Sequence, residues 1–279
     1  MKKMTQALLA GGVMAMAAGS VVNAALINVP FVFTDMVTVD PAAAWSDGGG
    51  NDIAFSRLNI GNTAVTQAAL APVTNFIPGN NFTVTTQFAI STNADGTSPS
   101  TTNRLSAVGI TLFGDTAVPT TGLFASLVIT ENRPSYDGGQ RLGLGTNRPS
   151  AGGSYVGNLP GNGDATTGET FLTGSNTPLA NGATPTYSFT VAVSYDNATQ
   201  VDVGLTVTDG TNTNTLTIND IDITGLAANN VFGLTLSERN RSLAGTFSNF
   251  TVNQVVPEPA SLALVAIGSA LLLSHRRRA

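Results

Sequence analysis

Hydrophobic and polar side chains alternate along most of the middle of the chain. The clearest stretch is residues 187–195, where every second residue is tyrosine, phenylalanine or valine and the residues between are serine, threonine or alanine. This period of two is typical of a half-buried β-strand. A turn at Asp196 leads into a second alternating stretch, residues 201–207, which ends at Asp209-Gly210, a common turn pair in hairpins. The two stretches therefore predict a β-hairpin.

Comparable alternation predicts further strands over residues 82–90, 108–112, 123–129, 231–236 and 246–252. Glycine, asparagine and threonine fill the gaps between these stretches. Only residues 63–70, after a candidate cap at Asn62, are expected to form a short helix. Regularly spaced short strands with turn signals predict an all-β fold, an antiparallel β-sandwich or jelly roll.

The hairpin at residues 187–210 and the last strand, Gly-Thr-Phe-Ser-Asn-Phe-Thr-Val at residues 245–252, carry a family resemblance. Both segments resemble the concanavalin A-like and laminin-G-like jelly rolls. The resemblance implies the same sandwich architecture for the domain. A generic immunoglobulin-like sandwich is the alternative.

The N-terminal segment differs from this pattern. Lys2 and Lys3 precede the apolar residues 7–18. The apolar Val22 and the small Ala24 lie at the −3 and −1 positions relative to the bond between Ala24 and Ala25. A basic start, an apolar run and a small-residue cleavage site are typical of a secretory signal peptide. We therefore expect an N-terminal signal helix that is removed after Ala24. A soluble amphipathic helix is disfavoured, because the segment has no charged face.

The C-terminal segment has three parts in a fixed order. Residues 260–273 carry no charge, and as a helix these fourteen residues would rise about 21 Å, less than the roughly 30 Å of a hydrocarbon core. The run is therefore short for a permanent membrane helix. A proline-rich motif, Val256, Pro257, Glu258 and Pro259, precedes the run. A basic cluster, Arg276, Arg277 and Arg278, follows it. The arginines favour a cytoplasmic C-terminus.

This order resembles the PEP-CTERM sorting signal of Gram-negative bacteria. The resemblance implies Sec export, signal peptidase, and processing near Pro257-Glu258-Pro259 by an exosortase, a membrane transpeptidase. The two prolines would keep the chain extended beside the bilayer, and the single hydrophobic helix would be a transient inner-membrane anchor. The protein would then reach the cell surface or the extracellular space. The expected organisation is a signal peptide at 1–24, a β-sandwich domain at 25–255 and the sorting signal at 256–279.

Composition excludes several classes of chemistry. The chain has no cysteine, and its one histidine, His275, lies in the C-terminal segment. Disulfides, thiolate metal sites and Cys-His or Ser-His-Asp catalysis are therefore excluded from the domain. Between the terminal segments, seven arginines and sixteen carboxylates leave a net charge of −9, with no lysine. Such a surface would repel nucleic acid, so we expect no nucleic-acid partner.

Two groups of carboxylates are candidates for metal binding or catalysis. Asp47-Gly-Gly-Gly-Asn-Asp52 is similar to one turn of a glycine-aspartate calcium repeat, but such repeats work in tandem, and a flexible acidic loop is favoured. Asp220 and Asp222 are similar to the paired acids of jelly-roll glucanases. No glutamate follows at a matching step, since the next one is Glu238. We expect no catalytic residue, no metal and no cofactor, and therefore no enzymatic activity.

Residues 131–186 contain a small duplication, Asn-Arg-Pro-Ser, that starts at Asn132 and again at Asn147. Arginine forks beside aromatic rings suit polar ligands such as polysaccharides with acidic groups. The candidate ligand-binding residues are Arg133, Tyr136, Arg148 and Tyr155. The favoured alternative is a long loop whose arginines pair with Asp137, Asp164 or Glu169.

Threonines recur on one face of another predicted strand, at Thr211, Thr213, Thr215 and Thr217, with Thr206 and Thr208 just before it. Flat Thr-x-Thr arrays can order ice-like water. A solvent-facing β surface is favoured, because the ladder does not repeat periodically along the chain.

The residues together predict an exported structural or adhesive protein of the cell surface or extracellular matrix, associated with exopolysaccharide. The main alternative is a glycan-binding, lectin-like module. A carboxylate-dependent polysaccharide hydrolase and an ice-binding protein are the less favoured alternatives.

Overall fold

The computed structural model describes residues 25–30, 37–39, 45–57, 65–95, 104–116, 121–133, 136–137, 140–145, 170–171, 180, 182–239 and 241–256. The predicted signal helix and the predicted C-terminal hydrophobic helix lie outside these residues. Among the described residues, no helix has both the length and the apolar character needed to span a bilayer. Residues 27–254 form one compact unit.

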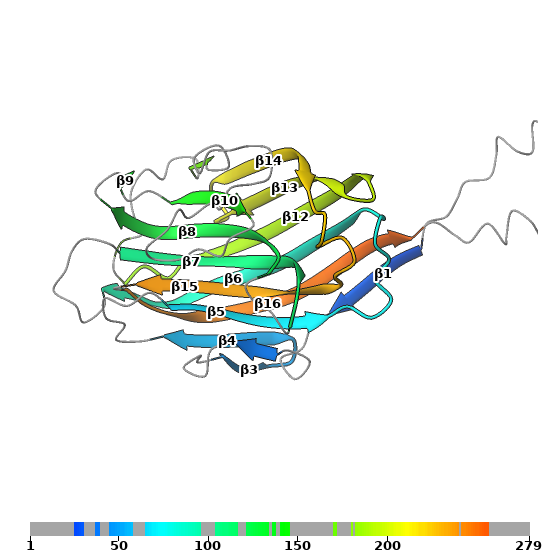
Figure 1. Cartoon of the computed structure of the whole chain (residues 1–279). Coiled ribbons are helices and arrows are strands. Elements are labelled where there is room, and N and C mark those ends of the chain that lie inside the picture. Colours follow the sequence, from blue (N-terminus) through cyan, green and yellow to red (C-terminus); the bar gives the residue numbers. More distant parts are fainter. Residues whose placement is uncertain are drawn as a thin grey trace, which may run out of the picture. The chain divides into compact units, whose positions relative to one another are not determined.

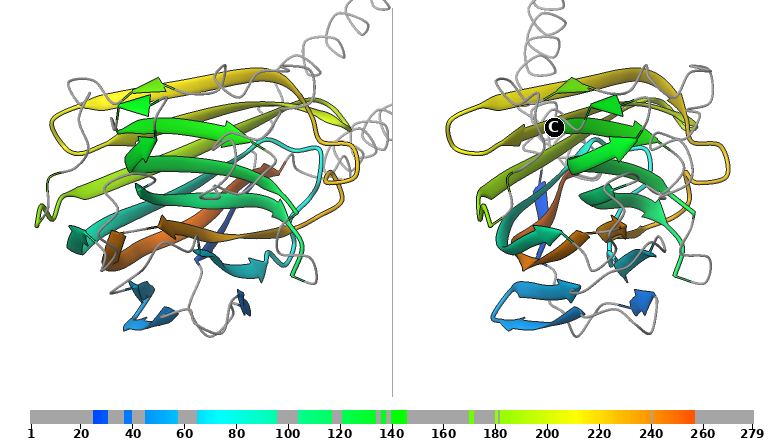
Figure 2. Two further views of the ribbon diagram at one scale, coloured as in Figure 1. Left: turned by 60° about the vertical axis from the view of Figure 1, so that its left-hand side comes forward. Right: turned by 90° about the vertical axis from the view of Figure 1, so that its left-hand side faces the viewer.

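The described residues form two antiparallel β-sheets that face each other (Figures 1 and 2). Sheet A has the order β14 (Thr213–Asp222), β13 (Gln200–Thr208), β12 (Thr186–Asn197), β6 (Phe82–Asp95), β16 (Arg241–Val256), β4 (Asp52–Arg57) and β3 (Trp45–Gly49), and β1 (Ala25–Pro30) also pairs with β16. Sheet B has the order β11 (Thr170–Phe171), β10 (Arg141–Gly145), β8 (Leu123–Arg133), β7 (Arg104–Gly114), β15 (Val231–Arg239), β5 (Val65–Pro72) and β2 (Val37–Val39), and β9 (Tyr136–Asp137) pairs with β8. The predicted all-β antiparallel sandwich is confirmed.

The core lies between the two sheets and follows the predicted alternation. On β12, Tyr187, Phe189, Val191 and Val193 are buried, while the residues between them are partly or fully exposed. Strand β13 alternates in the same way. The rings of Phe88 and Phe247 lie 4.9 Å apart in this core. Burial of each such side chain stabilises the fold by about 1.5–3 kcal/mol, so the alternation gives the sandwich its main driving force.

The prediction of a short helix at residues 63–70 is wrong. Strand β5 occupies most of that segment and pairs with β15 on one edge and β2 on the other. Its last residues carry buried apolar side chains, including Ala69 and Leu70. Backbone pairing on both edges therefore overrides the weak local preference for helix, as tertiary contacts commonly do.

The two sheets differ in how their outer faces are covered. In the middle of β7, β8 and β15, consecutive residues are buried, so side chains on both faces are shielded from water. Thr111 on β7 and Thr235 on β15, for example, are both buried and their hydroxyls lie 2.6 Å apart. Alternation had predicted one buried face for residues 108–112 and 123–129. Among the described strands, an extended polar face is therefore offered by sheet A.

Candidate functional site

The outer face of sheet A carries a row of threonines that crosses five neighbouring strands. The registers place these residues side by side, in the order Thr215 of β14, Thr206 of β13, Thr190 of β12, Thr85 of β6 and Thr251 of β16. We call this row the threonine rank. Neighbouring strands lie about 4.8 Å apart, so the hydroxyls recur at roughly that spacing. The hydroxyls of Thr85 and Thr251 are 2.8 Å apart and share a hydrogen bond.

A parallel row lies on each side of the threonine rank. One row consists of Thr213, Thr208, Ser188, Gln87 and Ser248, and the other of Thr217, Gly204, Ala192, Thr83 and Asn253. We call the three rows together the hydroxyl face. All fifteen residues are uncharged and partly or fully exposed. The arrangement is a neutral surface that can both donate and accept hydrogen bonds.

The turn between β13 and β14 helps to set this register. The carboxylate of Asp209 accepts hydrogen bonds from the backbone N–H groups of Thr211, at 2.9 Å, and Asn212, at 2.6 Å. These bonds, that of Asn212 first, lower the pKa of Asp209. Thr211 therefore belongs to the turn, and the predicted threonine ladder begins at Thr213.

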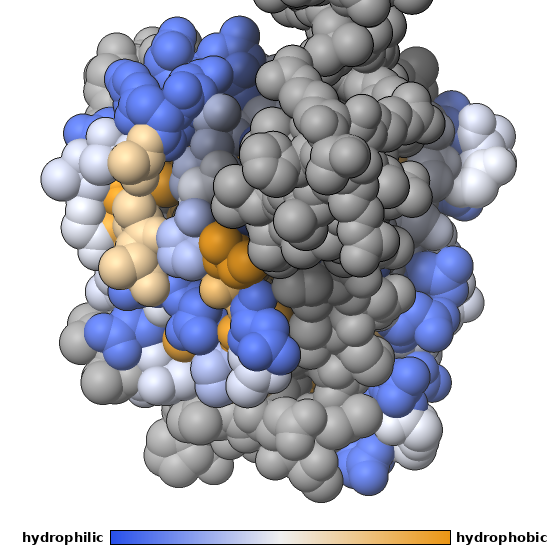
Figure 3. Space-filling model, turned by 90° about the vertical axis from the view of Figure 1, so that its right-hand side faces the viewer, coloured by the Kyte–Doolittle hydropathy of each residue, from blue (hydrophilic) through white to orange (hydrophobic). Residues whose placement is uncertain are grey.

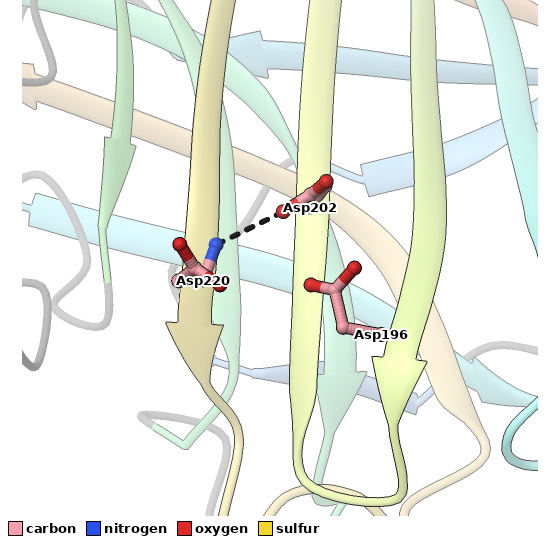
Figure 4. Close-up of side chains that lie close together, drawn as sticks. All are labelled: Asp196, Asp202 and Asp220. Carbon is pink, nitrogen blue, oxygen red and sulfur yellow. Dashed lines mark hydrogen bonds between the residues drawn. The ribbon is translucent and has the colours of Figure 1, made fainter.

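Three carboxylates gather where β12, β13 and β14 come together beyond the hydroxyl face. One carboxylate oxygen from each of Asp196, Asp202 and Asp220 lies within 4.8 Å of one from each of the other two (Figure 4). The backbone N–H of Asp220 donates to Asp202 Oδ1 at 2.9 Å. Residue 220 adopts a φ of 58° where the register between β13 and β14 shifts, so a bulge brings its side chain to the other two. We call these three residues the acidic cluster.

The acidic cluster concentrates negative charge at the surface. The pKa of Asp196 is raised, first by loss of contact with water and then by repulsion from Asp202, a hydrogen bond shared with it, and repulsion from Asp220. Carboxylates at this spacing can share a proton or approach a divalent cation such as Ca²⁺, which prefers oxygen ligands. The sequence alone does not reveal this cluster, although the predicted hairpin of β12 and β13 makes Asp196 and Asp202 neighbours.

The candidate arginine and tyrosine site is only partly placed by the structure. Arg133 ends β8 and Tyr136 begins β9, and the two residues are backbone partners in that short antiparallel pair. Arg148 and Tyr155 lie outside the described residues. The described half of this site belongs to sheet B, whereas the hydroxyl face belongs to sheet A.

The carboxylates singled out in the sequence have local structural roles. Asp47 lies in the β3–β4 hairpin, where its Oδ1 accepts a hydrogen bond from Gly49 N at 2.8 Å. Gly49 and Gly50 adopt φ values of 92° and 66°, which favour glycine, so these residues form the tight turn of this hairpin. Asp222 Oδ1 accepts the N–H of Thr224 at 2.8 Å. Of the predicted pair of acids, only Asp220 joins a group of carboxylates.

No protein-family model matches the chain, and no curated protein matches it in sequence. Solved structures similar to it include peanut lectin, at 13% identity and a TM-score of 0.44 over 84% of this chain and 99% of that chain. Alginate lyase Aly36B is similar at 12% identity and a TM-score of 0.43, over 81% of this chain and 89% of the lyase. An endo-1,3-β-glucanase from Streptomyces sioyaensis is similar at 14% identity and a TM-score of 0.42, over 76% of this chain and 79% of the enzyme. Likenesses this distant carry no argument about ligand or reaction.

Proposed function

We propose that the chain is an exported surface protein whose β-sandwich binds a neutral glycan on the hydroxyl face of sheet A. The observation that carries this proposal is the threonine rank with its two flanking rows, an uncharged polar surface that spans five strands. A glycan-binding module is therefore favoured over a purely structural or adhesive matrix component, which was the main expectation from the sequence.

The chemistry of the hydroxyl face suits a sugar. Threonine and serine hydroxyls each donate one hydrogen bond and accept others, and sugar hydroxyls do the same. Ile77 is the one large apolar side chain exposed among the described residues, so hydrogen bonding rather than ring stacking would hold the glycan there. The nearby acidic cluster would repel polysaccharides that carry carboxylates or sulfates. A neutral glycan is therefore the expected ligand.

Export is the second part of the proposal. The signal peptide would be removed after Ala24, and an exosortase would process the chain near Pro257-Glu258-Pro259 before release to the surface or the matrix. In support, β1 begins at Ala25 and β16 ends at Val256, so the two expected processing points adjoin the first and last described strands. The resemblance of the C-terminal segment to the PEP-CTERM signal supports the same route.

The test uses the exported protein, purified as the cell processes it, against a panel of neutral and uronate-containing polysaccharides. The paired variant Thr190→Val/Thr206→Val removes two hydroxyls from the centre of the threonine rank and keeps the side-chain shape. Loss of two hydrogen bonds of about 1 kcal/mol each should weaken binding by at least about tenfold. The control Thr74→Val lies in the exposed turn between β5 and β6 and should bind as the wild type does.

Binding to neutral glycans should persist when divalent cations are chelated. Loss of binding in chelator, and in Asp202→Asn, would move the site to the acidic cluster. Absence of binding to every neutral glycan, or equal affinities for the wild type and the paired variant, would contradict the proposal.

A further inference from the structure

The threonine rank has a regular direction and free hydroxyls at its centre. Its residues lie on five consecutive strands, so the rank runs across the strands rather than along them. Among the described residues, none is hydrogen-bonded to the hydroxyl of Thr190, Thr206 or Thr215. Thr85 and Thr251 pair with each other. Three adjacent strands therefore offer unengaged hydroxyls at the strand spacing of about 4.8 Å.

Beside the threonine rank, two neighbouring strands carry almost no side chain. Gly204 of β13 and Ala192 of β12 are direct partners on the outer face, and both are partly or fully exposed. Apart from its chain neighbours, a Cβ added to Gly204 would meet only the hydroxyl of Thr217 within 4 Å, at 3.8 Å. We call the positions of Gly204 and Ala192 the side-chain gap. The space above this gap is open to a ligand.

The two sides of the side-chain gap differ in chemistry. On one side are Thr206 and Thr190 of the threonine rank, each two residues along its strand from the gap. On the other side, Asp202 lies two residues before Gly204, on the same face of β13, and belongs to the acidic cluster. A small polar group in the gap would therefore find hydroxyls on one side and a carboxylate acceptor on the other.

The surface around the acidic cluster is also polar. The turn between β12 and β13 lies at the right-hand end of the sandwich in Figure 1, and Figure 3 looks onto that end. Most of the described surface there is hydrophilic, with only small hydrophobic patches. Hydrogen bonds, rather than stacking on apolar side chains, are therefore the contacts that the described residues offer a ligand beside the side-chain gap.

An extended chain of β-1,4-linked hexoses matches this surface in its repeat. Its sugars recur along the chain at nearly the spacing of neighbouring strands, so one sugar can lie on each strand of the threonine rank. The hydroxymethyl groups of such a ribbon alternate between its two edges, and one of them can enter the side-chain gap. Sheets twist, so a single soluble chain can follow the rank better than the flat face of a crystal can.

We propose that the hydroxyl face binds an extended β-1,4-linked hexose chain across its strands, with one sugar per strand along the threonine rank and one hydroxymethyl group in the side-chain gap. The inference rests on the proposed glycan binding, and it names the class of glycan and its direction on the sheet. The hydroxymethyl group donates a hydrogen bond to the carboxylate of Asp202. This contact separates hexoses from pentoses, because a pentose such as xylose lacks the group.

The experiment uses the exported protein and soluble oligosaccharides of two to six sugars, with affinities measured by calorimetry. Cello-oligosaccharides are β-1,4-linked hexoses, xylo-oligosaccharides are β-1,4-linked pentoses, and malto-oligosaccharides are α-1,4-linked hexoses that coil. Affinity for the cello series should rise by about fivefold with each sugar. The rise should level off at five sugars, since the threonine rank crosses five strands. The malto series should show no such rise.

The variant Gly204→Val tests the side-chain gap. Valine fills the open space above residue 204 and favours β-strands, so the urea midpoint should stay at or above that of the wild type. Binding of cellohexaose should weaken by at least about tenfold, because the hydroxymethyl group is displaced, while binding of xylohexaose should not change. The matched control Ser46→Val adds the same bulk on β3, on the same outer face but beyond the threonine rank, and should bind both as the wild type does.

Two results would overturn this inference. One is a cello series whose affinity stops rising at two sugars, or a malto series that binds equally well. The other is an equal effect of Gly204→Val on cellohexaose and xylohexaose. In either case, a neutral glycan whose binding is still weakened by Thr190→Val/Thr206→Val would leave the proposed function standing. Absence of binding to every neutral glycan would contradict the proposed function itself.

Discussion

Replacement of Tyr187 by phenylalanine tests whether the two sheets pack as described. The hydroxyl of Tyr187, on β12 of sheet A, donates to Oε1 of Gln140, which directly precedes β10 of sheet B, at 2.8 Å. Tyr187 is 1% exposed and Gln140 is 8% exposed, so water cannot replace the lost partner easily. The variant leaves Oε1 buried without its donor, which should lower the free energy of unfolding by about 1–3 kcal/mol. With a urea dependence of about 1–3 kcal/mol per molar, the midpoint should fall by roughly 1 M.

The double variant Tyr187→Phe/Gln140→Leu supplies the control. Replacement of both partners by apolar side chains of similar shape should recover most of the lost stability, since no buried polar atom remains unpaired. Burial, and then repulsion from Asp209, raise the pKa of Tyr187. The wild type should therefore lose stability above about pH 10, where the tyrosine of the unfolded chain ionises, and the phenylalanine variant should lack this component. A change below about 0.5 kcal/mol for the single variant would refute the contact between the sheets.

Three further substitutions test other parts of the fold. Asp196→Asn should raise the melting temperature at pH 7. The pKa of Asp196 is raised in the folded protein, so its ionised carboxylate destabilises the fold at pH 7, and the wild type regains this stability only as the pH falls and the carboxyl is protonated. An unchanged melting temperature would argue against the acidic cluster. Gly233→Ala should lower stability by about 3 kcal/mol in urea unfolding, because a Cβ there would overlap the backbone oxygen of Ala69 on the paired strand, and a neutral result would contradict that register. Asp209→Ala should destabilise the β13–β14 turn by no more than about 1 kcal/mol. This difference in stability should disappear as the pH falls through the lowered pKa of Asp209, because the protonated carboxyl no longer accepts the turn's hydrogen bonds as strongly. A difference that persisted at low pH would show that the carboxylate does not cap the turn.

The strands could be predicted because each one buries a single face through a local pattern. Residues 187–195 alternate over nine positions, and the structure buries Tyr187, Phe189, Val191 and Val193 and partly buries Tyr195. Segment 63–70 shows the limit of this approach, since β5 forms there through pairing with β15 and β2, which no local window contains. The same holds for β7 and β8, whose outer faces are buried although alternation predicted exposure.

The hydroxyl face could be predicted only in part. The threonines of β14 are visible as a ladder along the sequence, but Thr85 and Thr251 join the rank through registers between strands far apart in the chain. A repeat of threonines along the sequence therefore cannot reveal this array, because its rows run across strands that are distant in the chain. Similarly, Asp220 reaches Asp202 through a bulge, which depends on one residue with positive φ and has no reliable sequence signal.

Threonine-methyl NMR of the exported protein tests directly whether a neutral glycan binds on the threonine rank. The spectrum is recorded with and without a saturating neutral glycan that the binding panel identifies. We expect the methyl signals of Thr190, Thr206 and Thr215, on the threonine rank, to shift on addition of the glycan, while those of the buried Thr111 and Thr235 in sheet B stay unchanged. Shifts confined to residues of sheet B, or no shift on the threonine rank at saturation, would contradict it.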